Sequence, residues 1–113
     1  MFKVAIIGGE ESGDYKMFAK KCIFYLKNKT SEGITILSLG DNYINAFAKA
    51  TNIDVKEYLT EWGKYGKNAL KNRASLIINE CDAVILFDNG TKETNLYKKI
   101  ATEHKIPLRV VTL

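Results

Sequence analysis

Short apolar runs alternate with amphipathic stretches along the whole chain. Residues 2–9 (FKVAIIGG) form an apolar run with β-branched residues that ends in two glycines, which predicts a buried strand followed by a tight turn. Residues 33–40 (GITILSLG) and 82–87 (DAVILF) have the same character. Residues 52–59 alternate apolar and charged side chains as a half-exposed strand does, and residues 106–113 carry the single proline at a strand start. The pattern predicts five strands.

Helical patterns fill the intervals between these strands. In the first interval, apolar side chains recur on one helical face, and they are Tyr15, Phe18, Ala19, Cys22 and Leu26. Further helices are expected over residues 43–50, 68–80 and 96–105. Asp41 or Asn42 is expected to cap the helix over residues 43–50. The helix over residues 68–80 has an apolar stripe that comprises Ala69, Leu70, Leu76 and Ile77.

Strands that alternate with helices predict an α/β three-layer sandwich, with a five-stranded parallel Rossmann-like sheet in a single domain over residues 1–113. The first and fourth strands are the most uniformly apolar, so we expect them at the centre of the sheet, with the third at an edge. This arrangement is the strand order 3-2-1-4-5. Ligands of such sheets bind beyond the carboxyl ends of the strands where the winding reverses, here between strands one and four.

Composition agrees with an ordinary globular protein, because 46% of the residues are hydrophobic and 27% are charged. The net charge of +4 suits a phosphate-bearing partner but does not demand one, because lysines scattered over solvated helix exteriors account for it more simply. No run approaches the roughly 20 apolar residues of a membrane span, so we expect a cytoplasmic protein without a membrane partner. Cys22 and Cys81 lack CxxC spacing and have only His104 to assist them, which predicts reduced thiols and no metal site.

Two loops are expected to flank the crevice, GGEESGD (8–14) and DNGTKETN (88–95). Both lie at predicted helix N-termini, where free backbone N–H groups and the helix dipole attract anions. Gly8 and Gly9 would allow a close approach to a ligand, or serve packing alone. Ser12 would cap the following helix or bind a phosphate. The second loop offers Asn89, Gly90, Thr91 and Thr94 as ligand contacts, or as a capping turn.

Arg73 interrupts the apolar stripe of its helix at i+4 from Ala69, so its phase directs it inward. Arginine is rarely buried without a partner, and its guanidinium binds carboxylate or phosphate through a two-pronged fork. Two interpretations follow: an internal salt bridge to Asp41, Asp82 or Asp88, or a ligand contact at the mouth of the crevice.

The segment WGKYGKNALKNR (62–73) is the most distinctive motif. It fits the pattern DWxKYGKxAGxxRN at Trp62, Lys64, Tyr65, Gly66, Lys67, Ala69 and Arg73. Other matches are the glycine turn Gly8 and Gly9, the second-strand loop at Ser38, Gly40 and Asp41, and the fourth-strand loop at Asp88, Gly90 and Thr94. In this order the motifs resemble the SLOG superfamily, the Rossmann-like fold of DprA and the LOG proteins. They most resemble its YspA-type branch, DUF2493, and the resemblance covers nearly the whole chain.

The resemblance implies a DprA-like, nucleotide-binding module of the kind found in phages and bacterial conflict systems, which binds or senses a nucleotide-derived small molecule without strong catalysis and without a cofactor. The family's catalytic glutamate follows a GT pair, whereas here Glu93 and Thr94 stand in that pair and no acid follows before Glu103. The expected ligand-binding residues are Gly8, Gly9, Ser12, Ser38, Gly40, Asp41, Trp62, Lys67, Arg73, Gly90, Thr91 and Thr94.

Two alternatives stay open. The first is a nucleotide N-glycosidase, similar to phosphoribohydrolases or deoxyribosyltransferases, that uses Glu10 or Glu11 as its carboxylate. The second is DprA-like binding of single-stranded DNA, which the modest charge favours less. Related proteins commonly self-associate, so the resemblance leaves open both a monomer and a homo-oligomer.

The chain departs from the family pattern at several positions. The glycine-rich loop after the second strand is shortened to SLGD, with Leu39 at a glycine position. Leu70 and Ala74 replace the family's Gly and Asn, and a carboxylate at Glu93 would repel phosphate if it pointed inward. These changes indicate a diverged member whose ligand binding is altered or lost.

Overall fold

The computed structural model describes residues 1–28, 33–60 and 62–113, without the side chains of Trp62 and Lys64. Its elements are β1 (Phe2–Ile7), η1 (Gly9–Ser12), α1 (Tyr15–Leu26), β2 (Ile34–Ser38), α2 (Asn42–Thr51), β3 (Asp54–Glu57), α3 (Trp62–Tyr65), η3 (Gly66–Asn68), α4 (Ala69–Glu80), β4 (Ala83–Asp88), α5 (Lys92–Glu103) and β5 (Leu108–Thr112).

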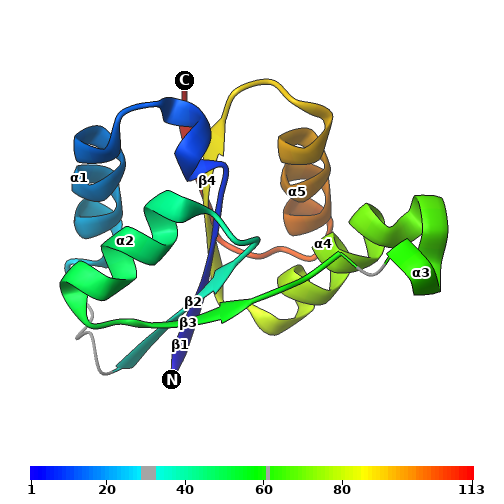
Figure 1. Cartoon of the computed structure of the whole chain (residues 1–113), viewed down its shortest axis with the longest axis horizontal. Helices are drawn as coiled ribbons and strands as arrows, with labels where there is room; N and C mark the ends of the chain where they lie inside the picture. Colours follow the sequence, from blue (N-terminus) through cyan, green and yellow to red (C-terminus); the bar gives the residue numbers. More distant parts are fainter. Residues whose placement is uncertain (29–32, 61) are drawn as a thin grey trace.

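The five strands form one parallel sheet in the order β3-β2-β1-β4-β5. Helices α1 and α2 cover one face, and α4 and α5 cover the other (Figure 1). The predicted α/β three-layer sandwich and its strand order are therefore confirmed. Winding reverses between β1 and β4, so the carboxyl ends of these two strands open between the two helical layers.

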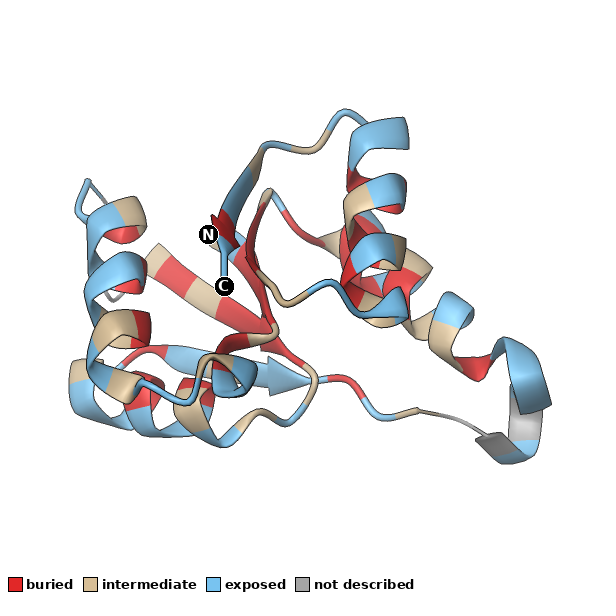
Figure 2. Cartoon of the chain, turned by 90° about the horizontal axis from the view of Figure 1, so that it is seen from above, coloured by how far each residue is buried: buried red, intermediate tan, exposed pale blue. Residues whose placement is uncertain are grey.

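Buried side chains fill a layer on each side of the sheet (Figure 2). Within β1, Val4 and Ile6 face the α1–α2 layer, whereas Ala5 and Ile7 face the α4–α5 layer. Because β1 and β4 are buried on both faces, they need apolar side chains at consecutive positions rather than at alternate ones. This requirement explains why their sequence patterns predicted central strands.

Each of three helices begins at a side chain that accepts a hydrogen bond from its first turn. Asp14 Oδ1 accepts from Met17 N at 3.1 Å at the start of α1, and Thr91 Oγ1 accepts from Thr94 N at 3.2 Å at the start of α5. Asp41 caps α2, as predicted. None of the helices in the described residues combines the length and the apolar character that a bilayer span requires.

The buried face of α4 differs from the predicted stripe. Leu76 was expected in the core but is 50% exposed, whereas Ala74 and Ile78 are buried together with Ala69 and Ile77. The prediction for Leu76 is wrong because α4 is rotated so that it packs against α5 as well as the sheet, which moves the buried face toward Ala74 and Ile78.

Candidate functional site

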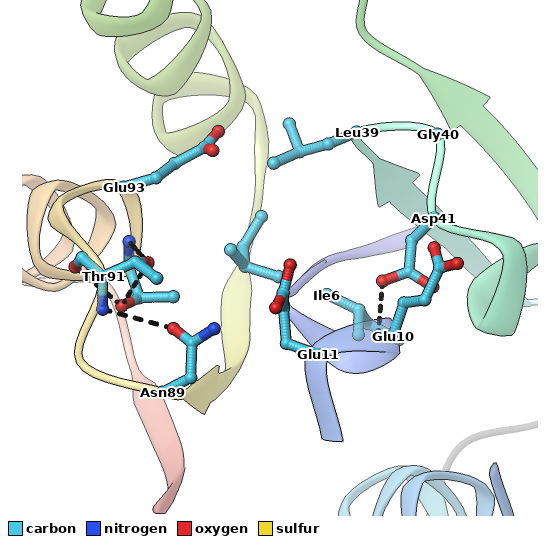
Figure 3. A pocket seen from close by; sticks show the side chains of 12 residues that line it. Ile6, Glu10, Glu11, Leu39, Gly40, Asp41, Asn89, Thr91 and Glu93 are labelled. Atoms are coloured by element: carbon cyan, nitrogen blue, oxygen red, sulfur yellow. Dashed lines mark hydrogen bonds between the residues drawn. The ribbon is translucent and has the colours of Figure 1, made fainter. Parts of the chain in front are cut away.

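A cavity of about 300 Å³ opens at the carboxyl ends of β1, β2 and β4, where the winding reverses (Figure 3). We call it the crevice. It is lined by Ile6, Ile7, Gly8, Glu10, Glu11, Leu39, Gly40, Asp41, Asn89, Thr91, Glu93 and Thr94. It lies where the strand order predicts a ligand site, and it is formed by segments that follow three different strands.

One wall of the crevice is a junction between η1 and the start of α2 (Figure 3). Asp41 Oδ2 accepts a hydrogen bond from Glu10 N at 2.7 Å, and Asp41 Oδ1 accepts from Tyr43 N at 2.7 Å and from Ile44 N at 3.3 Å. The Glu10 carboxylate accepts from Asn42 N and Asn42 Nδ2, each at 3.2 Å. The protein's own carboxylates therefore occupy the position at the α2 N-terminus that an anion would take.

The opposite wall, between β4 and α5, is also internally bonded. Asp88 Oδ1 accepts from Gly90 N at 2.9 Å and from Thr94 Oγ1 at 3.3 Å, while Asp88 Oδ2 accepts from Lys98 Nζ at 2.6 Å. The bond from Lys98, assisted by Gly90 N–H, lowers the pKa of Asp88. Thr91 N donates to Asn89 Oδ1 at 3.2 Å. We predicted free anion-binding amides in this loop, and for these amides that prediction is wrong.

Acid is expected to destabilise the protein partly through Asp88. Its folded pKa lies below the unfolded value, so its contribution to stability is complete above about pH 4 and is lost as the pH falls through the folded pKa. Urea unfolding measured from pH 2 to 7 should show that Asp88→Asn has a lower free energy of unfolding than wild type at pH 7. Below pH 4, the free energy of unfolding should fall less steeply with pH in Asp88→Asn than in wild type. Asp54→Asn is the control, because this exposed β3 carboxylate makes no side-chain hydrogen bond to the described residues. Equal acid slopes in wild type and Asp88→Asn would contradict the assignment.

Arg73 forms a salt bridge with Glu93, with Nη2 and Oε1 2.8 Å apart. The arginine side chain is 12% exposed and the glutamate 37%, so the pair is only partly shielded from water. The internal salt bridge that we considered exists, but Asp41, Asp82 and Asp88 are not its partner. The reason is that α4 and α5 pack side by side on one face of the sheet, so Arg73 meets a residue of α5 rather than a strand end. Asp82 instead accepts from Lys3 N at the opposite end of the sheet.

The crevice is acidic although the chain as a whole is basic. Four carboxylates line it, from Glu10, Glu11, Asp41 and Glu93, whereas no lysine, arginine or histidine of the described chain does. Glu11 makes no side-chain hydrogen bond or ion pair with the described residues and projects into the crevice (Figure 3). Within residues 1–28, 33–60 and 62–113, no group of His, Cys, Asp and Glu has the geometry of a metal site. The arrangement suits hydrogen-bond donors or a cation better than a phosphate.

Five of the predicted ligand-binding residues line the crevice, and they are Gly8, Gly40, Asp41, Thr91 and Thr94. Gly9 lies against the Phe18 ring, in the core, and does not line the crevice. Within the described part of the chain, Ser12 Oγ bonds with the backbone of Asp14 alone. Ser38 is buried and accepts a hydrogen bond from Gly40 N at 3.0 Å. Gly90 serves the turn, with a φ of 80°.

None of the side chains that the structure describes in the basic segment 62–73 lines the crevice. Lys67 is exposed on η3, and Arg73 lines a separate cavity beside α4. The side chain of Trp62 lies outside the described residues. Leu39 forms part of the crevice wall, whereas Leu70 does not.

Three carboxylates of the crevice were absent from the predicted ligand-binding set, namely Glu10, Glu11 and Glu93, although Glu10 and Glu11 were named as the carboxylates of a possible glycosidase. The available signal was their position, since all three lie in the two loops that follow the central strands. The charge of Glu93 argued against a role only because a phosphate ligand was assumed.

Comparison with known proteins identifies no family for this chain. The chain matches no protein-family model, and no curated protein matches it. The relation to the SLOG superfamily therefore stays a proposal that depends on the motifs named above.

Proposed function

We propose that the crevice binds the ribose and base of a nucleoside-type ligand and does not use a phosphate group as its anchor. The single observation that carries this proposal is a ligand-sized crevice at the switch point whose charged lining consists of carboxylates. In Rossmann-like folds, an acidic residue near this position accepts hydrogen bonds from ribose hydroxyl groups. The resemblance to SLOG proteins supports the same ligand class.

The carboxylates of the crevice have different roles in this proposal. Asp41 and Glu10 are held by backbone and Asn42 donors, so they fix the junction between η1 and α2. Glu11 and Glu93 have acceptor capacity left and would receive the ribose hydroxyl groups. Leu39, which is partly exposed, supplies an apolar surface of the crevice for the base.

A phosphate would meet unfavourable charge in the same place. Two unit charges 4 Å apart repel by about 4 kcal/mol at an effective dielectric constant of 20, and by less where solvent screens them. Because carboxylates already occupy the nearby amides, little compensation is available. The geometry therefore supports single-stranded DNA binding less than nucleoside binding.

The test is calorimetric titration with ribonucleosides, 2′-deoxyribonucleosides and ribonucleoside 5′-monophosphates. We expect the ribonucleoside to bind about tenfold more tightly than its 5′-monophosphate, with the 2′-deoxy compound weaker than the ribonucleoside. Glu11→Gln should reduce ribonucleoside affinity, whereas Glu103→Gln, at an exposed carboxylate at the end of α5, should not. Tighter binding of the monophosphate, or no binding across the panel, would refute the proposal.

Nucleoside N-glycosidase activity is a second candidate. It is favoured by the Glu11 carboxylate, which has no hydrogen-bond or ion-pair partner among the described residues. Cleavage of an N-glycosidic bond needs a carboxylate that stabilises or attacks the developing sugar cation. Release of free base from a ribonucleoside, abolished in Glu11→Gln, would support catalysis. Absence of base release at high protein concentration would leave binding alone.

A further inference from the structure

A second cavity, of about 270 Å³, lies beside α4 and is lined in part by Tyr65 of α3. Helix α3 projects from the body of the protein next to α4 (Figure 1). We call it the α4 groove, and it is lined by Leu59, Tyr65, Ala69, Asn72, Arg73, Leu76 and Asn79. Leu59 is 74% exposed, Leu76 50% and Tyr65 38%. Apolar side chains that gather around a hollow on the surface mark a binding site more often than scattered ones do.

The polar groups of the α4 groove are hydrogen-bond donors with unused capacity. Arg73 Nη2 donates to Glu93 and Nη1 donates to the Tyr58 carbonyl at 3.5 Å, while Nε is buried and has no partner among the described residues. A guanidinium carries five N–H donors, so Arg73 has more donors than acceptors around it. The side-chain amides of Asn72 and Asn79 also make no hydrogen bond to the described chain.

The charge of the α4 groove is opposite to that of the crevice. No aspartate or glutamate of the described chain lines it, and Lys67 and Lys71 are exposed on the adjoining turns of η3 and α4. The two cavities are connected by one ion pair, since Arg73 lines the groove and Glu93 lines the crevice. A positive groove of this kind attracts anions, and an apolar rim favours those with an apolar body.

We propose that the α4 groove is a second ligand site, which binds a small carboxylate carried on an aromatic or other apolar group. The carboxylate would take the remaining Nη N–H donors of Arg73, because Nε is buried, together with the side-chain amides of Asn72 and Asn79. The apolar group would lie against Leu59 and Leu76. An arginine fork fits a carboxylate in two-pronged geometry. The bound carboxylate competes with Glu93 for Arg73, so occupancy of the groove alters the acceptor that Glu93 presents to the crevice, and the effect is reciprocal.

The probe is benzoate, followed by NMR of the full chain with benzamide and acetate as comparisons. Benzoate should give saturable shifts of the Asn72 and Asn79 side-chain amides and of Arg73 Nε–H. Benzamide keeps the ring without the charge, and acetate keeps the charge without the ring, so each should bind at least tenfold more weakly. Benzamide binding as tightly as benzoate, or benzoate shifts confined to crevice residues, would overturn the proposal.

A pair of variants with the same charge change provides the control. Asn72→Asp places a carboxylate at the groove and should weaken benzoate binding about tenfold. Asn45→Asp makes the same change at an exposed position of α2 and should leave it unchanged. Unchanged binding in Asn72→Asp would also overturn the proposal. Ribonucleoside titrations of the same samples test the crevice separately. A negative result with benzoate therefore contradicts the α4 groove alone, and a negative result with ribonucleosides contradicts the crevice alone.

Discussion

Replacing Phe18 by alanine is expected to lower the free energy of unfolding by about 3–5 kcal/mol. Phe18 is fully buried, and its ring lies 5.0 Å from that of Phe87, 5.7 Å from Tyr43 and 6.1 Å from Phe47, between ring centroids. These neighbours come from β4 and α2, so truncation removes apolar contacts between three elements and leaves a cavity that they cannot all close. The predicted loss is a large part of the stability of a typical domain, about 5–15 kcal/mol.

Urea unfolding followed by circular dichroism measures this loss, and Phe24→Ala is the matched control. Phe24 lies on the same helix but is 58% exposed, so its truncation should cost less than about 1 kcal/mol. Phe18→Leu keeps most of the apolar volume and should lose about 1–2 kcal/mol, which provides a folded variant if the alanine form does not fold. Similar losses for Phe18→Ala and Phe24→Ala would contradict the assignment of Phe18 to the core.

The sheet could be predicted from the sequence because its signal is local. A strand buried on both faces needs consecutive apolar residues, and Val4–Ile7 and Val84–Phe87 supply them at two separate places in the chain. The edge position of β3 follows from the exposed charges of Asp54 and Lys56. The location of the crevice then follows from strand order alone.

The character of the crevice could not be predicted in the same way, because it depends on contacts between distant segments. Glu10 and Asp41 are 31 positions apart, yet Asp41 fixes the Glu10 backbone and Glu10 caps the helix that Asp41 starts. The partner of Arg73 depends on how α4 and α5 are rotated against each other. That rotation is decided by packing around buried residues such as Ala74 and Tyr97. As a result, the face of α4 that is buried differs from the face that the apolar stripe predicted.

Replacing Gly9 by alanine is expected to cost about 2–3 kcal/mol of stability. A Cβ atom at this position would lie 2.1 Å from Phe18 Cε1 and 2.5 Å from Phe18 Cδ1. The ring cannot easily move away because it is held against Phe87, so the added methyl group must lift η1 from the core. Gly63→Ala is the control, since a Cβ there meets no atom of the described residues within 4 Å and alanine is the better helix former by up to about 1 kcal/mol.

The clash and the buried ring are one interaction, which a double-mutant cycle can show. In the Phe18→Leu background the Gly9→Ala substitution should cost less than about 1 kcal/mol, because the ring atoms closest to the new methyl group are gone. Additive costs would mean that Gly9 is constrained by something other than Phe18. Since η1 carries Glu10 and Glu11 into the crevice, Gly9→Ala should also weaken ribonucleoside binding in the wild-type background and do so less in Phe18→Leu. Packing beneath η1 and ligand affinity above it would then change together, because one turn of the chain serves both.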